Sequence, residues 1–317
     1  MRAGFLLIGM MALRVVSLTA QETDFPALIG PYLGQSPPGA VPEIFAPEII
    51  SRESDFEHSA AVFSPDGKEV FWCMRRNLFS DLPGDEQQRL YFMKNVDGKW
   101  TAPQMAPFME EVPQSVFRPV FSPDGNRIYL EYFSDPDAER DTDIYVVERE
   151  GDGWSRPAPV SPLINTPAME TLFSVTRDGS MYFGRHVHTR NEKVFVSRMV
   201  DGVFSEPEEL GDAFNTPARE GMILVAPDES FMLVSQTPLG MADERVMVSY
   251  QRPDGTWTER IETPLTFTGG FLSLSPDGNY LFFLGEGILW VGTSFIEELK
   301  PGYLKNVGSV VSTLGGG

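Results

Sequence analysis

The chain repeats one pattern of apolar and polar positions five times. Each copy has an apolar strand, a short polar turn and a second apolar strand. In most copies the turn reads Pro-Asp-Gly: Pro fixes φ, Asp bonds the backbone that follows it, and Gly accepts positive φ, so each copy predicts a β-hairpin. The five copies are AVFSPDGKEVFW (61–72), VFSPDGNRIYL (120–130), SVTRDGSMYF (174–183), LVAPDESFML (224–233) and SLSPDGNYLF (273–282).

Each hairpin is followed by two further strands. The turn aspartates are 58, 54, 50 and 49 residues apart and are Asp66, Asp124, Asp178, Asp228 and Asp277. The third strands are expected at 90–93, 144–147, 194–197, 246–249 and 288–291. In the first four copies an Asp-Gly turn then opens a polar fourth strand, which in three copies contains proline. Proline removes a ladder donor, so these strands suit an outer edge.

Four strands in each of five repeats predict an all-β fold, a five-bladed β-propeller of four-stranded antiparallel blades. The fifth repeat lacks its fourth strand and runs into a segment of helical character at 294–300. The N-terminal segment 42–50 resembles the fourth strand at 100–108, so we expect it to complete the last blade and close the ring. The alternative is six blades, for which only about 25 residues remain after the fifth third strand.

The Phe-Ser-Pro-Asp-Gly pattern, followed by Asp-Gly-x-Trp, resembles the WD-like repeat of the TolB-type β-propellers of exported bacterial proteins. The resemblance covers roughly residues 42–300. It implies export across the inner membrane and binding of a ligand or partner, without a catalytic set common to the family.

The first 20 residues are typical of a signal peptide, with Arg2, an apolar stretch at 5–13 and small residues at 17–20. We expect a linker at 21–41, one propeller domain at 42–300 and a C-terminal tail at 301–317. The apolar stretch is too short to span a bilayer, and no cysteine follows it for lipid attachment. The prediction is a periplasmic or secreted protein with no transmembrane segment in the mature chain.

Composition narrows the choice of partners. Apolar residues make up 42% of the chain, enough for a substantial core, and Cys73 is the only thiol, so no internal disulfide forms. With 45 acidic and 25 basic residues, the formal net charge is −20. A negatively charged protein repels polyanions, which argues against nucleic acid as a partner.

At the face of the propeller opposite the Pro-Asp-Gly turns, the sequence differs from one blade to the next. The segments NTPAME (165–170) and NTPARE (215–220) precede the first strands of the third and fourth blades. Innermost strands begin at the channel mouth, so these side chains should converge there and bind a ligand. The candidates are Glu170, Glu220, His58 in the same register of the first blade, the adjacent Glu57, and Arg118. The alternative is that the repeated segment shapes the connection between blades.

Two groups of residues on that face could bind a divalent metal. His186 and His188 are two positions apart on a strand, a spacing that suits zinc together with Glu170. The acidic loop at 135–143 offers Asp135, Asp137, Asp141 and Asp143, oxygen ligands that suit calcium. The alternatives are a solvated strand end and an acidic surface loop.

Two classes of function remain open. The first is a non-catalytic module that binds a small molecule or glycan, a peptide or a protein partner at the channel mouth. The second is a carbohydrate-active enzyme, either a glycoside hydrolase that uses two of Glu57, Glu170 and Glu220, or a polysaccharide lyase that uses histidine and a metal. The chain has no Gly-x-Ser-x-Gly elbow, phosphate loop or His-Glu-x-x-His motif. Two carboxyl groups about 5–10 Å apart in an aromatic pocket would favour hydrolysis.

Overall fold

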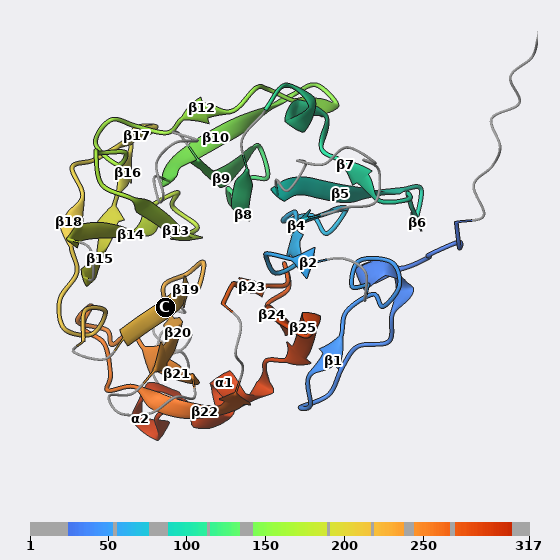
Figure 1. Cartoon of the computed structure of the whole chain (residues 1–317). Helices are drawn as coiled ribbons and strands as arrows, with labels where there is room; N and C mark the ends of the chain where they lie inside the picture. Colours follow the sequence, from blue (N-terminus) through green and yellow to red (C-terminus); the bar gives the residue numbers. More distant parts are fainter. Residues whose placement is uncertain are drawn as a thin grey trace, which may run out of the picture.

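The computed structural model describes residues 25–52, 56–75, 88–112, 115–133, 142–188, 191–216, 219–237, 244–266 and 270–305. Within them the chain is all-β and forms a five-bladed β-propeller, as the repeat predicts. The blades surround a central axis, with β8, β13, β19 and β23 innermost (Figure 1).

Blades 1 to 3 are the first three of the five blades. Blade 1 contains Phe56–Glu57 (β2), Val62–Phe63 (β3), Glu69–Arg75 (β4), Gln88–Val96 (β5), Lys99–Trp100 (β6) and Gln104–Met105 (β7). Blade 2 contains Val116–Phe121 (β8), Arg127–Phe133 (β9), Thr142–Glu150 (β10), Gly153–Trp154 (β11) and Ala158–Pro159 (β12). Blade 3 contains Glu170–Val175 (β13), Met181–His188 (β14), Asn191–Ser197 (β15), Met199–Val200 (β16), Val203–Phe204 (β17) and Glu208–Glu209 (β18).

Blades 4 and 5 complete the ring. Blade 4 contains Arg219–Val225 (β19), Phe231–Thr237 (β20), Arg245–Tyr250 (β21) and Ile261–Thr266 (β22). Blade 5 contains Leu272–Leu274 (β23), Tyr280–Gly285 (β24), Gly287–Gly292 (β25) and the N-terminal Glu43–Ile44 (β1). The short helical elements are Pro31–Gly34 (η1), Pro107–Glu111 (η2), Ser294–Leu299 (α1) and Gly302–Lys305 (α2), and α1 confirms the predicted helical segment.

The core lies between the blades, because both faces of each sheet pack against a neighbour. Strand β4 is therefore buried from Glu69 to Met74, and Cys73 on it is fully buried, as expected of a small apolar side chain. Between blades 1 and 2, the Phe71 ring packs against Phe121 and Trp154. The second strand of each hairpin is buried on both faces, which explains why its apolar residues follow one another without alternation.

The N-terminal strand closes the ring, which confirms the prediction made from segment 42–50. Strand β1 pairs antiparallel with β25, and Glu43 lies opposite Trp290. The fully buried Phe45 ring then packs 5.2 Å from the ring of Trp290. The preceding segment contacts blade 1, where the indole N–H of Trp100 donates to the Gly30 carbonyl at 2.8 Å. One segment therefore joins the first and last blades.

The fourth strands of blades 1 to 3 are interrupted, whereas the sequence pattern predicts one strand in each. In blade 1, β6 and β7 each pair with β5, and Pro103 lies between them. Proline has no N–H to donate to the ladder, so pairing stops there and resumes beyond it.

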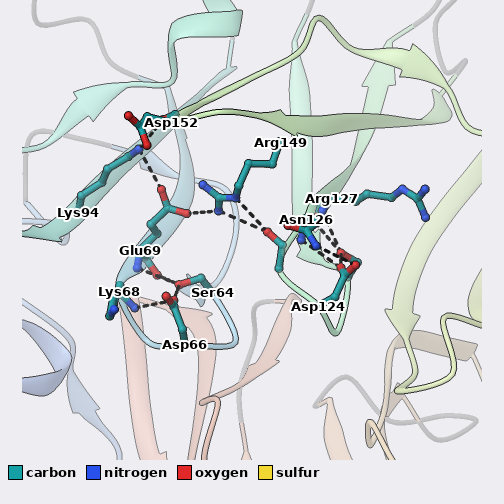
Figure 2. A network of polar contacts seen from close by, with 12 residues as sticks. Ser64, Asp66, Lys68, Glu69, Lys94, Asp124, Asn126, Arg127, Arg149 and Asp152 are labelled. Atoms are coloured by element: carbon teal, nitrogen blue, oxygen red, sulfur yellow. Dashed lines mark hydrogen bonds and ion pairs between the residues drawn. The ribbon is translucent and has the colours of Figure 1, made fainter.

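The Pro-Asp-Gly turns are held by their own side chains. The Asp66 carboxylate accepts from the Ser64 hydroxyl at 2.7 Å and from the Lys68 N–H at 3.1 Å. Burial alone would raise the pKa of Asp66, but these hydrogen bonds outweigh it and hold the pKa below its usual value. The same arrangement recurs around Asp124, and Figure 2 shows the two turns side by side.

Between these two turns an ion-pair network joins blades 1 and 2. The carboxylate of Glu69 lies 3.1 Å from the Lys94 ammonium and 2.5 Å from the Arg149 guanidinium (Figure 2). Arg149 also packs over the Trp154 ring. These ion pairs thus hold the two blades together at this end of the propeller.

Candidate functional site

The inner strands surround an opening to which all five blades contribute. Its lining residues are Ser59, Ala60, Val62, Arg118, Pro119, Val120, Leu172, Phe173, Met222, Phe271 and Leu272. Arg118 is the one charged residue in this set, and the set contains no aspartate or glutamate. The opening is therefore an apolar pocket with a single cationic group in its wall.

Local backbone geometry places Arg118 in the wall. The pairing of β8 with β9 shifts register between Phe117 and Val120, which is a β-bulge, and Arg118 lies within it. Its φ is 46°, in the left-handed region that is strained for a residue with a side chain. Pro119 follows directly, and a residue before proline is disfavoured in the right-handed helical region.

The Arg118 guanidinium has two defined neighbours. Nη1 donates to Oε1 of Glu131 at 2.7 Å, and the group lies 4.8 Å from the centroid of the Phe271 ring. The Nε atom is buried and has no hydrogen-bond acceptor among the described residues. A buried N–H that bonds to nothing is costly, and such exceptions in a folded protein require an explanation.

Glu131 is the functional residue that sequence reasoning missed. Its carboxylate is buried, accepts from Arg118, and also accepts from the backbone N–H of Leu172 in blade 3 at 2.7 Å. Burial raises the pKa of Glu131, although the Arg118 charge and the Leu172 N–H act in the opposite direction. The signal in the sequence is an acidic residue between Leu130 and Tyr132, in a strand that is otherwise apolar around it.

Aromatic side chains form a rim beside Arg118. The His58 ring lies 5.2 Å from Phe117 and 5.3 Å from Phe271, and Phe117 lies 5.1 Å from Phe133. All four rings are half-buried, so part of each surface meets solvent. Burial, with a further contribution from the Arg118 charge, lowers the pKa of His58 to about 4, so its imidazole is neutral at pH 7. We call Phe117, Phe133, Phe271 and His58 the aromatic rim.

Glu170, by contrast, is enclosed in its own loop. Its carboxylate is fully buried and accepts from the Thr166 hydroxyl at 2.6 Å and from the Thr166 N–H at 3.2 Å. The Arg185 guanidinium lies 3.0 Å away and also donates to the carbonyls of Leu163 and Ile164. Burial raises the pKa of Glu170 to about 7 against these interactions. These contacts account for the carboxylate as part of the connection between blades.

The repeated Asn-Thr-Pro-Ala segment anchors that connection in both blades. In blade 3 the Asn165 amide exchanges two hydrogen bonds of 2.9 Å with the backbone of Ile144. In blade 4 Asn215 contacts the backbone of Val194 in the same way, at 2.9 and 3.5 Å. The backbone of Glu220 pairs with β20, and its side chain lies outside the described residues.

Glu57 and the two histidines of blade 3 have separate surroundings. The Glu57 side chain is buried and accepts from the Arg52 N–H at 3.2 Å. The Nε2 atom of His186 lies 3.6 Å from Oε1 of Glu192, and the strand pairing shifts register between His186 and His188. The side chain of His188 lies outside the described residues.

No cluster that could hold a metal is present among the described residues. Within them, no three His, Cys, Asp or Glu side chains are grouped closely enough to coordinate an ion. Asp143 lies on β10, opposite Tyr132 of β9, whereas Asp135, Asp137 and Asp141 lie outside the described residues. The zinc and calcium sites remain predictions from the sequence.

No family model matches the chain, and no curated protein matches it either. Among solved structures, a putative TolB from Agrobacterium tumefaciens is 18% identical with a TM-score of 0.45, and the alignment covers 72% of this chain and 69% of that one. In the described part of the present chain no helix has the length and apolar character needed to cross a membrane.

Two further solved structures are similar over comparable parts of the chain. A Hadza microbial sialidase is 13% identical with a TM-score of 0.47, over 74% of this chain and 53% of that one. Prolyl oligopeptidase B from Galerina marginata is 15% identical with a TM-score of 0.43, over 72% of this chain and 30% of that one. The chain thus spans about a third of the length of the oligopeptidase. These similarities concern the fold alone.

Proposed function

We propose that the chain is an exported β-propeller binding module that holds a saccharide, a peptide or a protein partner at the channel mouth. The observation that carries the proposal is Arg118, whose buried Nε–H has no acceptor among the described residues and which lies in the wall of a pocket built by all five blades. Buried donors are nearly always paired in folded proteins, so a buried donor left open at a concave site supports a role in recognition.

Backbone strain supports the same role. Arg118 and Phe271 both have left-handed φ values, 46° and 68°, and each costs about 1–3 kcal/mol relative to an ordinary conformation. The two residues come from blades 2 and 5 and their side chains contact each other. Strain of this kind persists where the surrounding structure fixes it, and it concentrates at binding and catalytic sites.

A binding role fits the pocket better than glycoside hydrolysis does. Hydrolysis requires an acid and a second carboxylate that both reach the substrate. The lining residues of the pocket include neither aspartate nor glutamate, and the Glu170 carboxylate is fully buried in its loop. Export is proposed from the N-terminal 20 residues, and the net charge of −20 continues to argue against nucleic acid as the partner.

The test compares Arg118→Lys with the wild-type protein on a glycan array and against a displayed peptide library. Lysine keeps the charge but lacks the second donor group and the planar fork. Arg127→Lys is the matched control, because Arg127 lies on the same blade in an exposed pair with Glu148. We expect probes bound by the wild type and by the control to be lost by Arg118→Lys.

Two results would overturn the proposal. One is equal binding of every probe by the wild type and by Arg118→Lys, provided that thermal unfolding shows the variant to be folded. The other is turnover of aryl glycosides by the purified protein, which would assign the chain to the enzymes instead.

A further inference from the structure

The arginine of the pocket has its charge balanced within the protein. Nη1 of Arg118 lies 2.7 Å from the Glu131 carboxylate, and the Leu172 N–H fixes that carboxylate from the other side. The exposed fraction of the side chain is 7% for Glu131 and 20% for Arg118. A ligand therefore reaches the arginine, whereas the glutamate lies behind it and cancels its charge.

The aromatic rim next to the arginine is apolar and uncharged at neutral pH. Phe117, Phe133 and Phe271 have half-buried rings, and His58 between Phe117 and Phe271 is neutral because its pKa is lowered to about 4. The faces of aromatic rings carry partial negative charge and attract C–H groups that bear partial positive charge. The carbon atoms of a sugar ring carry such hydrogens, because each is bonded to oxygen.

We propose that the ligand at the channel mouth is a neutral saccharide, one sugar ring of which packs on the aromatic rim while one of its oxygens accepts from the partly exposed guanidinium of Arg118. This proposal rests on the proposed function and narrows it to one ligand class. Glu131 is a positioning residue in this arrangement: it holds the guanidinium in place and does not touch the sugar.

The charge of the site favours a neutral sugar over an acidic ligand. An acidic ligand would meet an arginine already neutralised by Glu131 and a chain with a net charge of −20.

The experiment uses matched probes that differ only at C6, where one of each pair carries a charge. These are the methyl glycosides of glucose, galactose and mannose, each beside its counterpart oxidised to a uronate at C6. Binding is measured by saturation-transfer NMR and by titration. We expect at least one neutral glycoside to bind and its uronate to bind about five-fold or more weakly. Arg118→Lys should weaken binding of the neutral glycoside by about ten-fold or more, because a hydrogen bond to a charged group is lost.

Two further variants keep the test decisive. Phe133→Leu removes one ring of the rim without touching the Arg118–Glu131 pair, and it should weaken the neutral glycoside several-fold even if Arg118→Lys does not fold. Arg127→Lys should bind like the wild type. Saturation transfer to the sugar C–H protons should fall in Phe133→Leu, a signature that a merely structural change at a distance would not produce.

The outcomes separate this inference from the function on which it rests. Tighter binding of a uronate than of its neutral partner would replace the neutral class with an acidic one. Arg118-dependent binding of peptides, with no binding of any glycoside, would overturn the saccharide assignment and leave the binding module in place. Glycoside binding that is unchanged in both Arg118→Lys and Phe133→Leu would overturn both.

Discussion

The guanidinium of Arg118 lies 4.8 Å from the centre of the Phe271 ring, and both residues have a left-handed backbone, with φ of 46° and 68°. Arg118 comes from blade 2 and Phe271 from the start of blade 5, so their contact crosses the channel axis region rather than following one sheet. The ion pair with Glu131 holds the arginine in this conformation. At Arg118, the strained backbone is thus offset by the ion pair of its side chain with Glu131.

Arg118→Gly separates these two effects. Glycine removes the backbone strain, worth about 1 kcal/mol, but it leaves the Glu131 carboxylate buried without its cation, which costs about 3–5 kcal/mol. We expect a net loss of about 3 kcal/mol in the free energy of unfolding, measured with urea. The double variant Arg118→Gly with Glu131→Gln should recover about 1–2 kcal/mol, because the uncompensated charge is gone. A single variant about 1 kcal/mol more stable than the wild type would show that the pair contributes nothing, because only the strain relief would then remain.

Ring closure predicts that substitutions at Ile44, the last residue of β1, and at Phe45, which follows it, change the stability by different amounts. Phe45 is fully buried against Trp290, whereas 44% of Ile44 is exposed on the outer edge of blade 5. Phe45→Ala should lower the free energy of unfolding by about 3–5 kcal/mol, and Ile44→Ala, the matched control, by less than about 1 kcal/mol. Deletion of residues 42–50 should lower the melting temperature sharply, because β25 then has an unpaired edge. Equal melting of the deletion variant and the parent would contradict the closure.

The repeat made the fold predictable, because the apolar alternation and the turn chemistry act within about 12 residues of chain. The five hairpins and the closing strand followed from that local information. Of the residues that form the candidate site, only Arg118 and His58 were predicted from the sequence. Glu131 meets Arg118 across two strands and Leu172 across two blades, and Phe271 of blade 5 meets Arg118 and His58 only when the ring is closed. Such contacts depend on side-chain positions that no spacing along the chain specifies.

The turn of blade 4 departs from the repeat for a reason that the structure provides. Glu229 stands where the other four turns have glycine, and its φ is 59°. Its carboxylate accepts from the buried Tyr182 hydroxyl at 2.6 Å and lies 2.5 Å from the Arg198 guanidinium, joining blades 3 and 4. The left-handed conformation is therefore offset by contacts that glycine could not make.

Glu229→Gly tests that balance. Relief of the left-handed strain stabilises the protein by about 1 kcal/mol, while the Tyr182 hydroxyl is left without its acceptor, which costs about 1–3 kcal/mol, and a half-exposed pair with Arg198 is lost. The expected net change is a loss of about 1 kcal/mol in urea unfolding. Tyr182→Phe in the Glu229→Gly background should restore most of it, because no buried hydroxyl then remains unpaired. A gain in stability in the single variant would mean that strain dominates at this turn.

The buried Glu170 carboxyl makes the free energy of unfolding depend on pH in the opposite sense to the turn aspartates. Burial raises its pKa from 4.5 to about 7 in the folded protein, so the folded state binds this proton more tightly than the unfolded state does. The stabilisation by Glu170 is therefore complete below pH 4.5 and is lost as pH rises toward and through 7. Turn aspartates such as Asp66 have lowered pKa values, so their stabilisation is lost instead as pH falls below about 4.

Glu170→Gln isolates the contribution of Glu170, because glutamine resembles the protonated carboxyl and does not titrate. A shift of this size corresponds to about 3 kcal/mol, taking about 1.4 kcal/mol per pKa unit. We expect the difference in the free energy of unfolding, wild type minus variant, to decrease by up to that amount between pH 5 and pH 8. Urea unfolding of both proteins across this range measures the difference, and the contributions of His58 and the turn aspartates cancel in it because both proteins contain them. A difference that is flat with pH would mean that Arg185 and Thr166 keep the carboxylate ionised in the folded protein.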